Sequence, residues 1–251
     1  DSAPARRAIL PSSMGLSVLV GPEVRELEAC VSWGDYVFEG AGEESVRAGL
    51  VECAAAGVSD RWVEELVLQS YLFAGFPRAL NAAREWRRAR ETPAGNGAER
   101  SAERTEERTE ERSAEHSPTP GPARGGESYA DVYEWRRRGE ETCETVYGHF
   151  YEKLRANIRG LHPAFDEWMI VEGYGKVLSR PGLDLARREL CIVAACVAAG
   201  QDRQLHSHLH GALHAGASGD AIVATLDALA GVVGETDLHR ARLLFARVTG
   251  K

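Results

Sequence analysis

Apolar residues recur at helical spacing through much of the chain, and short polar or glycine-containing turns separate the apolar stretches. Asp184 precedes a stretch that ends at Gly200, and residues 190–201 carry no charged side chain. This pattern predicts a helix that Asp184 caps and that is buried on nearly all sides. Similar patterns predict further helices over 60–73, 77–90, 202–216, 219–230 and 237–247, with Ser59 or Asp60, Asp202, Ser218 and Asp237 as N-caps.

The two sets of predicted helices are separated by a charged segment without an apolar face. Residues 98–117 read AERSAERTEERTEERSAEHS, and prolines and glycines flank this run on both sides. Such a composition offers nothing to pack against a core. We therefore predict a disordered linker over 92–127, with helical regions at 1–91 and 128–251.

A weak internal repeat relates the two helical regions. When 46–59 (VRAGLVECAAAGVS) is aligned with 205–218 (LHSHLHGALHAGAS), Gly57 corresponds to Gly216 and Ser59 to Ser218. This similarity favours a duplicated helical hairpin. Gly49 stands where the second copy has His208, so we expect the first half to serve packing and not catalysis.

Composition narrows the class of protein. The formal net charge is −8 and no apolar run approaches the ~20 residues that a membrane-spanning helix requires. An acidic surface does not attract nucleic acid or anionic lipid in general. The five cysteines are odd in number and scattered, which argues against a disulfide framework. We expect a cytoplasmic protein that binds neither nucleic acid nor membrane.

Two features of the predicted helices could support chemistry. Glu189 stands at the start of the uncharged segment, and Cys196 lies seven positions on, near the same helix face. A Glu in such a place is a candidate proton carrier, although a partly exposed Glu paired with Arg187 or Arg188 explains it better. His208 follows on the next predicted helix, and the tight turn between the two helices can bring it towards Glu189. A carboxylate that orients an imidazole is a general acid–base pair.

The same helix carries three more histidines. His206, His210 and His214 repeat every fourth residue, which is a spacing used by metal ligands. No further ligand is visible in the sequence, so a solvated polar face explains these histidines better. We expect no metal site.

Three segments resemble the carboxymuconolactone decarboxylase family in their order and spacing. They are RGEETCETVYG (138–148), LHPAFDEWMIVEGYGKVLSRPGLDLARREL (161–190) and QLHSHLHGALHAGAS (204–218). The resemblance covers about 138–235, and residues 48–83 resemble the terminal part of such a domain. It implies an all-α, alkylhydroperoxidase D-like helical bundle, present here in a duplicated form.

The decarboxylase branch of the family implies an enzyme that needs no cofactor and acts on a small carboxylated or lactone substrate. By this resemblance His208 is the acid–base residue and Glu189 orients it. We expect Arg180 or Arg187, with His206, to bind an anionic substrate. Cys196 is a candidate residue of the pocket, although a buried structural thiol explains it better.

The peroxidase branch of the family implies a different activity that depends on a Cys-x-x-C pair between the Glu and the His. Counted from Glu189, the two cysteine positions are Gln201 and Gln204. Glutamine supplies neither a nucleophilic nor a resolving thiol. A peroxidase would have to use Cys196 or Cys191 instead.

A third alternative is a non-catalytic binding or scaffold protein that keeps the fold. In all cases we expect self-association, because two helical hairpins leave apolar faces that neither can cover alone. Single-domain members of the family form rings of six, so the resemblance implies a homotrimer of the duplicated chain.

Overall fold

The computed structural model describes residues 43–91 and 131–250. The described residues are helical apart from turns and one isolated bridge between Ala230 and Val233. The predicted all-α class is therefore confirmed. The whole segment predicted as a linker, 92–127, lies outside the described residues, so that prediction stays open. Among the described helices, none is long and apolar enough to cross a membrane.

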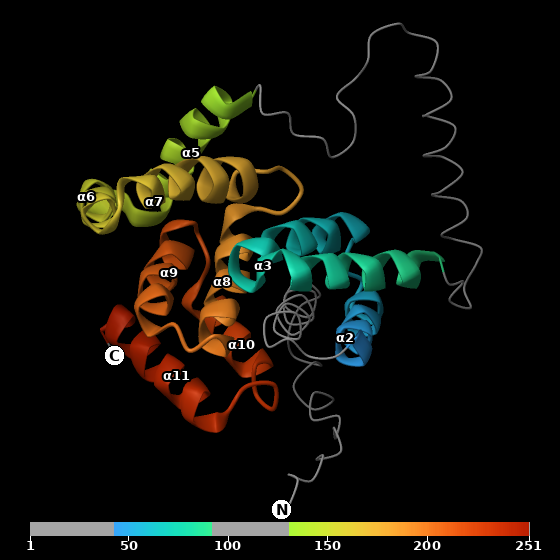
Figure 1. Cartoon of the computed structure of the whole chain (residues 1–251). Helices are drawn as coiled ribbons and strands as arrows, with labels where there is room; N and C mark the ends of the chain where they lie inside the picture. Colours follow the sequence, from blue (N-terminus) through green and yellow to red (C-terminus); the bar gives the residue numbers. More distant parts are fainter. Residues whose placement is uncertain (1–42, 92–130, 251) are drawn as a thin grey trace, which may run out of the picture.

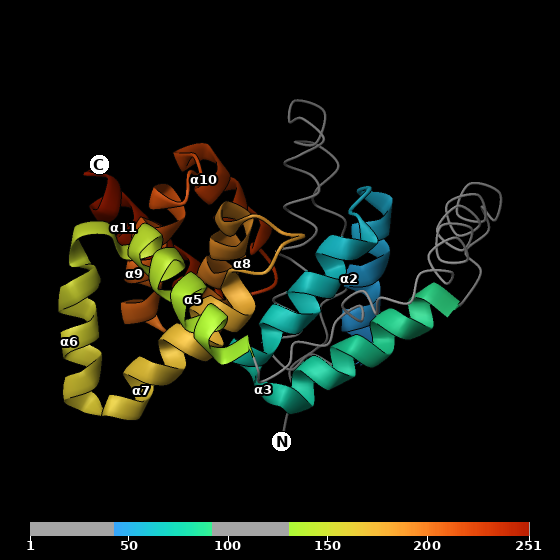
Figure 2. The same ribbon diagram turned by 90° about the horizontal axis from the view of Figure 1, so that it is seen from above.

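The N-terminal part consists of α2 (Glu43–Ala55) and the long α3 (Asp60–Glu91). Gly75 interrupts α3 with a φ of 78° and a ψ of 161°, values that a residue with a side chain rarely adopts. Figure 2 shows the two arms of α3 leaving this bend as a V. The arms correspond to the two helices predicted over 60–73 and 77–90, and Pro77 begins the second arm.

The C-terminal part is a bundle around one central helix. Figures 1 and 2 show α8 in the middle, with α9 and α10 on one side and α3 on the other. Every residue from Arg188 to Val197 is buried. The burial predicted for the uncharged residues 190–201 is thus confirmed up to Val197, whereas residues 199–201 are exposed at the end of the helix. The elements of this part are α5 (Val132–Tyr147), η2 (Gly148–Phe150), α6 (Tyr151–Leu161), α7 (Pro163–Trp168), η3 (Met169–Leu178), α8 (Leu185–Ala198), α9 (Asp202–His214), α10 (Gly219–Ala228) and α11 (Glu235–Thr249).

Two glycines allow α5 and η3 to cross in close contact. A Cβ at Gly139 would lie 2.1 Å from the Ile170 carbonyl oxygen, and a Cβ at Gly175 would lie 1.9 Å from the Trp135 carbonyl oxygen. Neither position tolerates a side chain. The element η3 is a π-helix, a wider helix that occurs often at functional sites.

The predicted helix starts are right at Ser59, Asp184 and Ser218 and wrong at two other positions. Asp184 accepts a hydrogen bond from the Arg187 amide, and Ser218 accepts one from the Ala221 amide. Asp202 and Asp237, in contrast, lie inside the first turns of α9 and α11. In α11 the N-cap is Gly234, whose extended backbone starts the helix at Glu235 and leaves Asp237 to stabilise the first turn by its charge.

The two aligned repeat segments have similar turns. Gly57 follows α2 with a φ of 82°, and Gly216 follows α9 with a φ of 98°. Ser59 and Ser218 then accept hydrogen bonds from the backbone amides of Trp62 and Ala221. This local similarity supports the predicted duplication, which itself stays a prediction.

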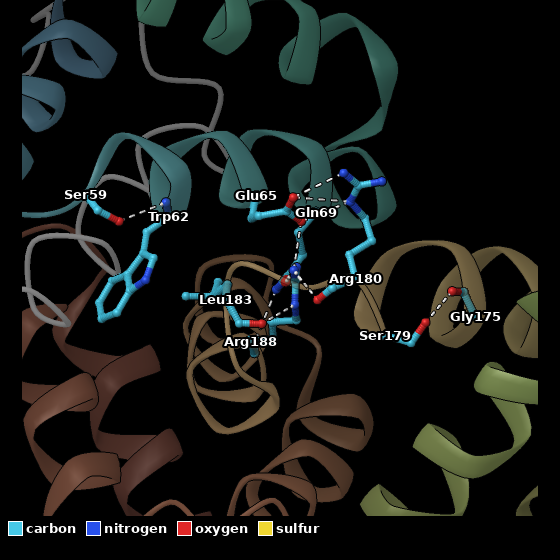
Figure 3. A network of polar contacts seen from close by, with 9 residues as sticks. All are labelled: Ser59, Trp62, Glu65, Gln69, Gly175, Ser179, Arg180, Leu183 and Arg188. Carbon is cyan, nitrogen blue, oxygen red and sulfur yellow. Dashed lines mark hydrogen bonds and ion pairs between the residues drawn. The ribbon is translucent and has the colours of Figure 1, made fainter. Parts of the chain in front are cut away.

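A buried polar network joins α3 to α8 (Figure 3). Arg188 is fully buried and donates to Glu65 at 2.8 Å and to the Gln69 side-chain oxygen at 3.2 Å. Gln69 in turn donates to the Arg188 carbonyl oxygen, and Arg180 pairs with Glu65 at 3.0 Å. A buried guanidinium needs such partners, because an unpaired charge in the core is strongly destabilising. The network thus fixes α3 against the central helix.

Candidate functional site

An acid–histidine pair lies in the core between α8 and α9. Glu189 is fully buried and His208 is 8% exposed. The Glu189 Oε2 atom and the His208 Nδ1 atom are 2.7 Å apart, which is a short hydrogen bond. The predicted contact between these residues is confirmed. The alternative of a partly exposed Glu189 paired with Arg187 or Arg188 is wrong, because both arginines have other acidic partners.

This hydrogen bond orients the imidazole ring. When Nδ1–H donates to the carboxylate, the Nε2 atom is left to exchange protons with another molecule. Within 43–91 and 131–250, no protein group forms a hydrogen bond with Nε2 of His208. The pair has the composition and contact of a general acid–base unit, in which one carboxylate positions one imidazole.

Gly211 makes room for the carboxylate. It lies on α9, less than one turn beyond His208, and a Cβ at this position would be 2.9 Å from Glu189 Oε2 and 2.6 Å from a methyl carbon of Val146. Only a glycine allows α9 to approach Glu189 this closely without displacing it.

Tyrosine and cysteine side chains surround the Glu189 carboxylate. Tyr147 from α5 and Tyr174 from η3 hydrogen-bond to each other, with ring centroids 6.1 Å apart. Burial raises the pKa of both phenols, and the negative charge of Glu189 raises each further. Burial and the charge of Glu189 also raise the pKa of the Cys143 and Cys196 thiols. These groups make a largely apolar environment in which the neutral forms of the phenols and thiols are favoured.

The second oxygen of Glu189 is unsatisfied. Oε1 is buried and has no hydrogen-bond partner among the described residues. Such an atom costs free energy in a folded protein, and native structures retain few of them. It is an acceptor available to a proton, a water molecule or a ligand.

The aromatic ring of Phe73 covers His208 from the N-terminal part. The two ring centroids are 6.5 Å apart and the rings meet edge to face. Phe73 is 38% exposed and lies two residues before the bend at Gly75. Sequence reasoning did not select Phe73, Tyr147 or Tyr174, although Tyr147 and Tyr174 both stand within the segments that carry the family resemblance.

The residues predicted to bind an anionic substrate contact other parts of the protein. Arg180 pairs with Glu65, and Arg187 pairs with Asp184 and stacks over the Trp62 ring at 4.5 Å. His206 is exposed, with its ring 5.0 Å from that of His210. Both arginines therefore have acidic partners, and their role towards substrate stays a prediction.

Comparison with known proteins adds a match to one family. Residues 164–246 match the sequence profile of the carboxymuconolactone decarboxylase family. This region is thus similar to a carboxymuconolactone decarboxylase family domain. It contains Glu189, His208, Tyr174 and Cys196, whereas Phe73 and Tyr147 precede it. No curated protein matches the chain.

The thiols of the region that matches the carboxymuconolactone decarboxylase family are poorly placed for peroxidase chemistry. Cys191 and Cys196 are buried, and burial raises the pKa of the Cys196 thiol to about 12, with a smaller contribution from Glu189. Peroxide reduction requires an accessible thiolate. Gln201 and Gln204, at the positions of the family's cysteine pair, are exposed. Cys30 lies outside the described residues.

His206, His210 and His214 form a histidine stripe on α9. The described residues contain no group of three or more His, Cys, Asp or Glu side chains arranged to hold a metal ion. His214 Nδ1 is already 2.8 Å from the Val146 carbonyl oxygen. Partial burial is the main reason why the pKa of His210 is lowered. Electrostatic repulsion from the nearby His206 and His214 lowers it further.

The described surface carries an apolar groove apart from the acid–histidine pair. It lies between α3, α6, α7 and η3 and is lined by Tyr71, Leu72, Ile158, Leu161, Phe165, Trp168, Met169, Glu172 and Gly173. Neither Glu189 nor His208 lines this groove, and both are buried.

Proposed function

We propose that the protein is a cofactor-independent acid–base enzyme of the decarboxylase type, which acts on a small carboxylated or lactone substrate. The contact between Glu189 and His208 carries the proposal, because it combines burial, a short hydrogen bond and a free imidazole nitrogen. The family match of the surrounding region agrees with this chemistry.

In the proposed reaction, the bond between the substrate carbon and its carboxylate breaks and CO₂ leaves. The electron pair stays on the substrate, where it is delocalised into the conjugated lactone carbonyl group, so an extended enolate forms. The imidazolium of His208 then delivers the Nε2 proton to carbon, and the resulting imidazole regains a proton from solvent. Glu189 stabilises the imidazolium and keeps its ring in place.

The walls of the site contribute by excluding water. The buried phenols of Tyr147 and Tyr174 and the thiol of Cys196 surround Glu189 without a competing charge. A low-dielectric surrounding strengthens the attraction between the carboxylate and the imidazolium. The unsatisfied Oε1 atom can accept a hydrogen bond from a substrate hydroxyl or a relayed water.

The test uses carboxymuconolactone as the probe and measures CO₂ release by the full chain. His208→Ala is expected to lower kcat roughly 10²–10⁴-fold, the usual contribution of a general acid. Glu189→Gln keeps an acceptor for Nδ1 but loses the charge, so it is also expected to lower kcat. His239→Ala removes an exposed histidine on α11 and is the matched control.

Undiminished turnover in His208→Ala would exclude the assignment. Should neither turnover nor a ligand-dependent rise in melting temperature occur across a panel of lactones and carboxylic acids, the scaffold alternative gains instead. Peroxide consumption that depends on Cys191 or Cys196 would favour the peroxidase alternative.

A further inference from the structure

Three residues of α3 share one face that meets the candidate site and its central helix. Glu65, Gln69 and Phe73 follow each other at intervals of four, so they lie one above the other along the first arm of α3. The first two bind Arg188 of α8, and the third meets His208 of α9. One helix face therefore carries both Glu65 and Gln69, which with Arg188 we call the anchor, and Phe73, which we call the cover.

The anchor lies next to the catalytic candidate in sequence. Arg188 and Glu189 are neighbours on α8, and their side chains point to different partners, Arg188 to α3 and Glu189 to α9. Figure 3 shows Glu65 and Gln69 reaching from α3 to Arg188. Because Gln69 also donates to the Arg188 carbonyl oxygen, both the side chain and the backbone of α8 are tied to α3 at this point.

The cover is less firmly held than the anchor. Phe73 is 38% exposed, whereas Glu65 and Gln69 are 6% and 2% exposed. The regular helix ends at Gly75, so Phe73 occupies the last turn of the first arm. A side chain at a helix end can change its rotamer or its position at a lower cost than one in the middle of a packed helix.

We propose that Phe73 is a specificity-determining residue, which covers His208 and limits the size of the molecules that reach its imidazole. This rests on the proposed function of the Glu189–His208 pair and names a part of the site that lies outside the family-matched region. The molecules admitted are expected to be small, because the Phe73 ring meets the imidazole edge to face and His208 is only 8% exposed.

The first experiment needs no substrate. Diethyl pyrocarbonate acylates unprotonated imidazoles, and mass spectrometry of the full chain measures the rate at each histidine. The rate at His208 is expected to rise several-fold in Phe73→Ala, to rise less in Phe73→Leu and to fall in Phe73→Trp. Exposed His206 and His239 serve as internal references and are expected to keep their rates.

The matched control is Leu68→Ala. Leu68 is on the same arm of α3 and is 44% exposed, but at about 100° per residue it lies about 140° around the helix from Phe73. This variant is expected to leave the rate at His208 unchanged. The ordered response to side-chain size separates a cover from a merely structural role, and the Leu and Trp variants keep the test decisive where the Ala variant folds poorly.

The second experiment compares kcat/KM for carboxymuconolactone with that for bulkier analogues, which carry an added alkyl group away from the carboxylate that leaves as CO₂ and keep that carboxylate free. Phe73→Ala is expected to raise the relative rate on the larger molecules several-fold. A rate at His208 that is the same with Ala, Phe and Trp at position 73 would overturn the inference, even if turnover is observed. Size-dependent reactivity without any turnover would overturn the proposed function alone.

Discussion

At the scale of single residues, the close approach of α9 to Glu189 depends on the absence of a side chain at Gly211. A methyl group there meets both the carboxylate and Val146 at distances shorter than contact. The helix or the carboxylate must therefore move when a Cβ is added, and the hydrogen bond to His208 must change with it.

We predict that Gly211→Ala lowers the free energy of unfolding by about 1–3 kcal/mol, the usual cost of overpacking a core. Thermal or denaturant unfolding measures this. Gly160→Ala on α6 is the control, because nothing lies within 4 Å of the added Cβ. It is expected to be neutral or stabilising by about 0.5–1 kcal/mol, since alanine favours helix. Equal effects of the two substitutions would contradict the crowding at Gly211.

The buried thiols give a prediction about pH. Burial raises the pKa of Cys196 to about 12 from a usual value of 9.0. Below pH 9 the thiol is protonated in both states and contributes nothing to the pH dependence of stability. As the pH rises from 9 towards 12, the unfolded state loses this proton first, so the stability falls.

Cys196→Ala is therefore expected to flatten the decline of stability between pH 9 and 12, as followed by chemical denaturation at each pH. In the native parent, iodoacetamide at pH 8 is expected to modify Cys196 far more slowly than after unfolding. Rapid modification of the native thiol would revive the peroxidase alternative.

The separation of two residues along the chain decides whether their contact could be predicted from the sequence. Glu189 and His208 lie on consecutive helices joined by a short turn, so local spacing was sufficient to predict their contact. Phe73 and Tyr147 reach the same site from distant elements, and no periodicity shows which face of α3 or α5 meets it. The partner of Arg188 was missed for this reason too, because Glu65 is distant in sequence.

At the scale of elements, the association of α3 with α8 depends on the charge of Glu65. Burial raises the pKa of this carboxyl, but hydrogen bonds and the charges of Arg180 and Arg188 outweigh burial, so the pKa lies below its usual value of 4.5. The stabilisation is therefore present above about pH 4.5 and is lost as the pH falls through the lowered pKa.

We predict that Glu65→Gln lowers the free energy of unfolding by about 3–5 kcal/mol at pH 7, because Arg188 is then buried without a counter-charge. Chemical denaturation measures this loss. Glu64→Gln on the neighbouring, exposed position removes only a surface pair with Arg90 and is expected to change stability by ~1 kcal/mol or less. A loss of similar size in both variants would contradict the role of the buried network.

Predicted helix boundaries were correct where a side-chain cap decides them, as at Asp184 and Ser218. They were wrong at Asp202 and Asp237, because backbone geometry at the preceding residues starts those helices earlier. The sequence predicted that one helix ends at Phe73 and that the next begins at Pro77, and the bend at Gly75 lies between these two positions. That the two arms diverge around one bend was not visible in the sequence.

At the scale of the whole molecule, α3 and α8 hold the two described parts together without the intervening chain. We predict that the chain, cut at a protease site inserted near residue 117, keeps both fragments associated at pH 7. Co-elution in size-exclusion chromatography measures this. The same cut in Glu65→Gln is expected to release the fragments, and in Glu64→Gln to leave them together. Separation of the parental fragments would contradict a stable contact.

The expected self-association belongs to the same scale and stays a prediction. Leu161, Phe165 and Trp168 are 75%, 55% and 58% exposed around the apolar groove near α6 and α7. Large exposed apolar patches often mark interfaces. Sedimentation equilibrium of the full chain distinguishes a monomer from the trimer that the family resemblance implies.

Phe73, Cys143 and Tyr147 precede the family-matched region in the sequence. This order has a consequence for the recombination of such genes, in nature and in engineering. An exchange of residues 164–246 with a homologous gene would transfer Glu189 and His208 but not the three side chains that enclose them. Recombinants joined at those borders would therefore combine a pair from one protein with an enclosure from another. Junctions placed ahead of α2 would keep the donor's enclosure intact.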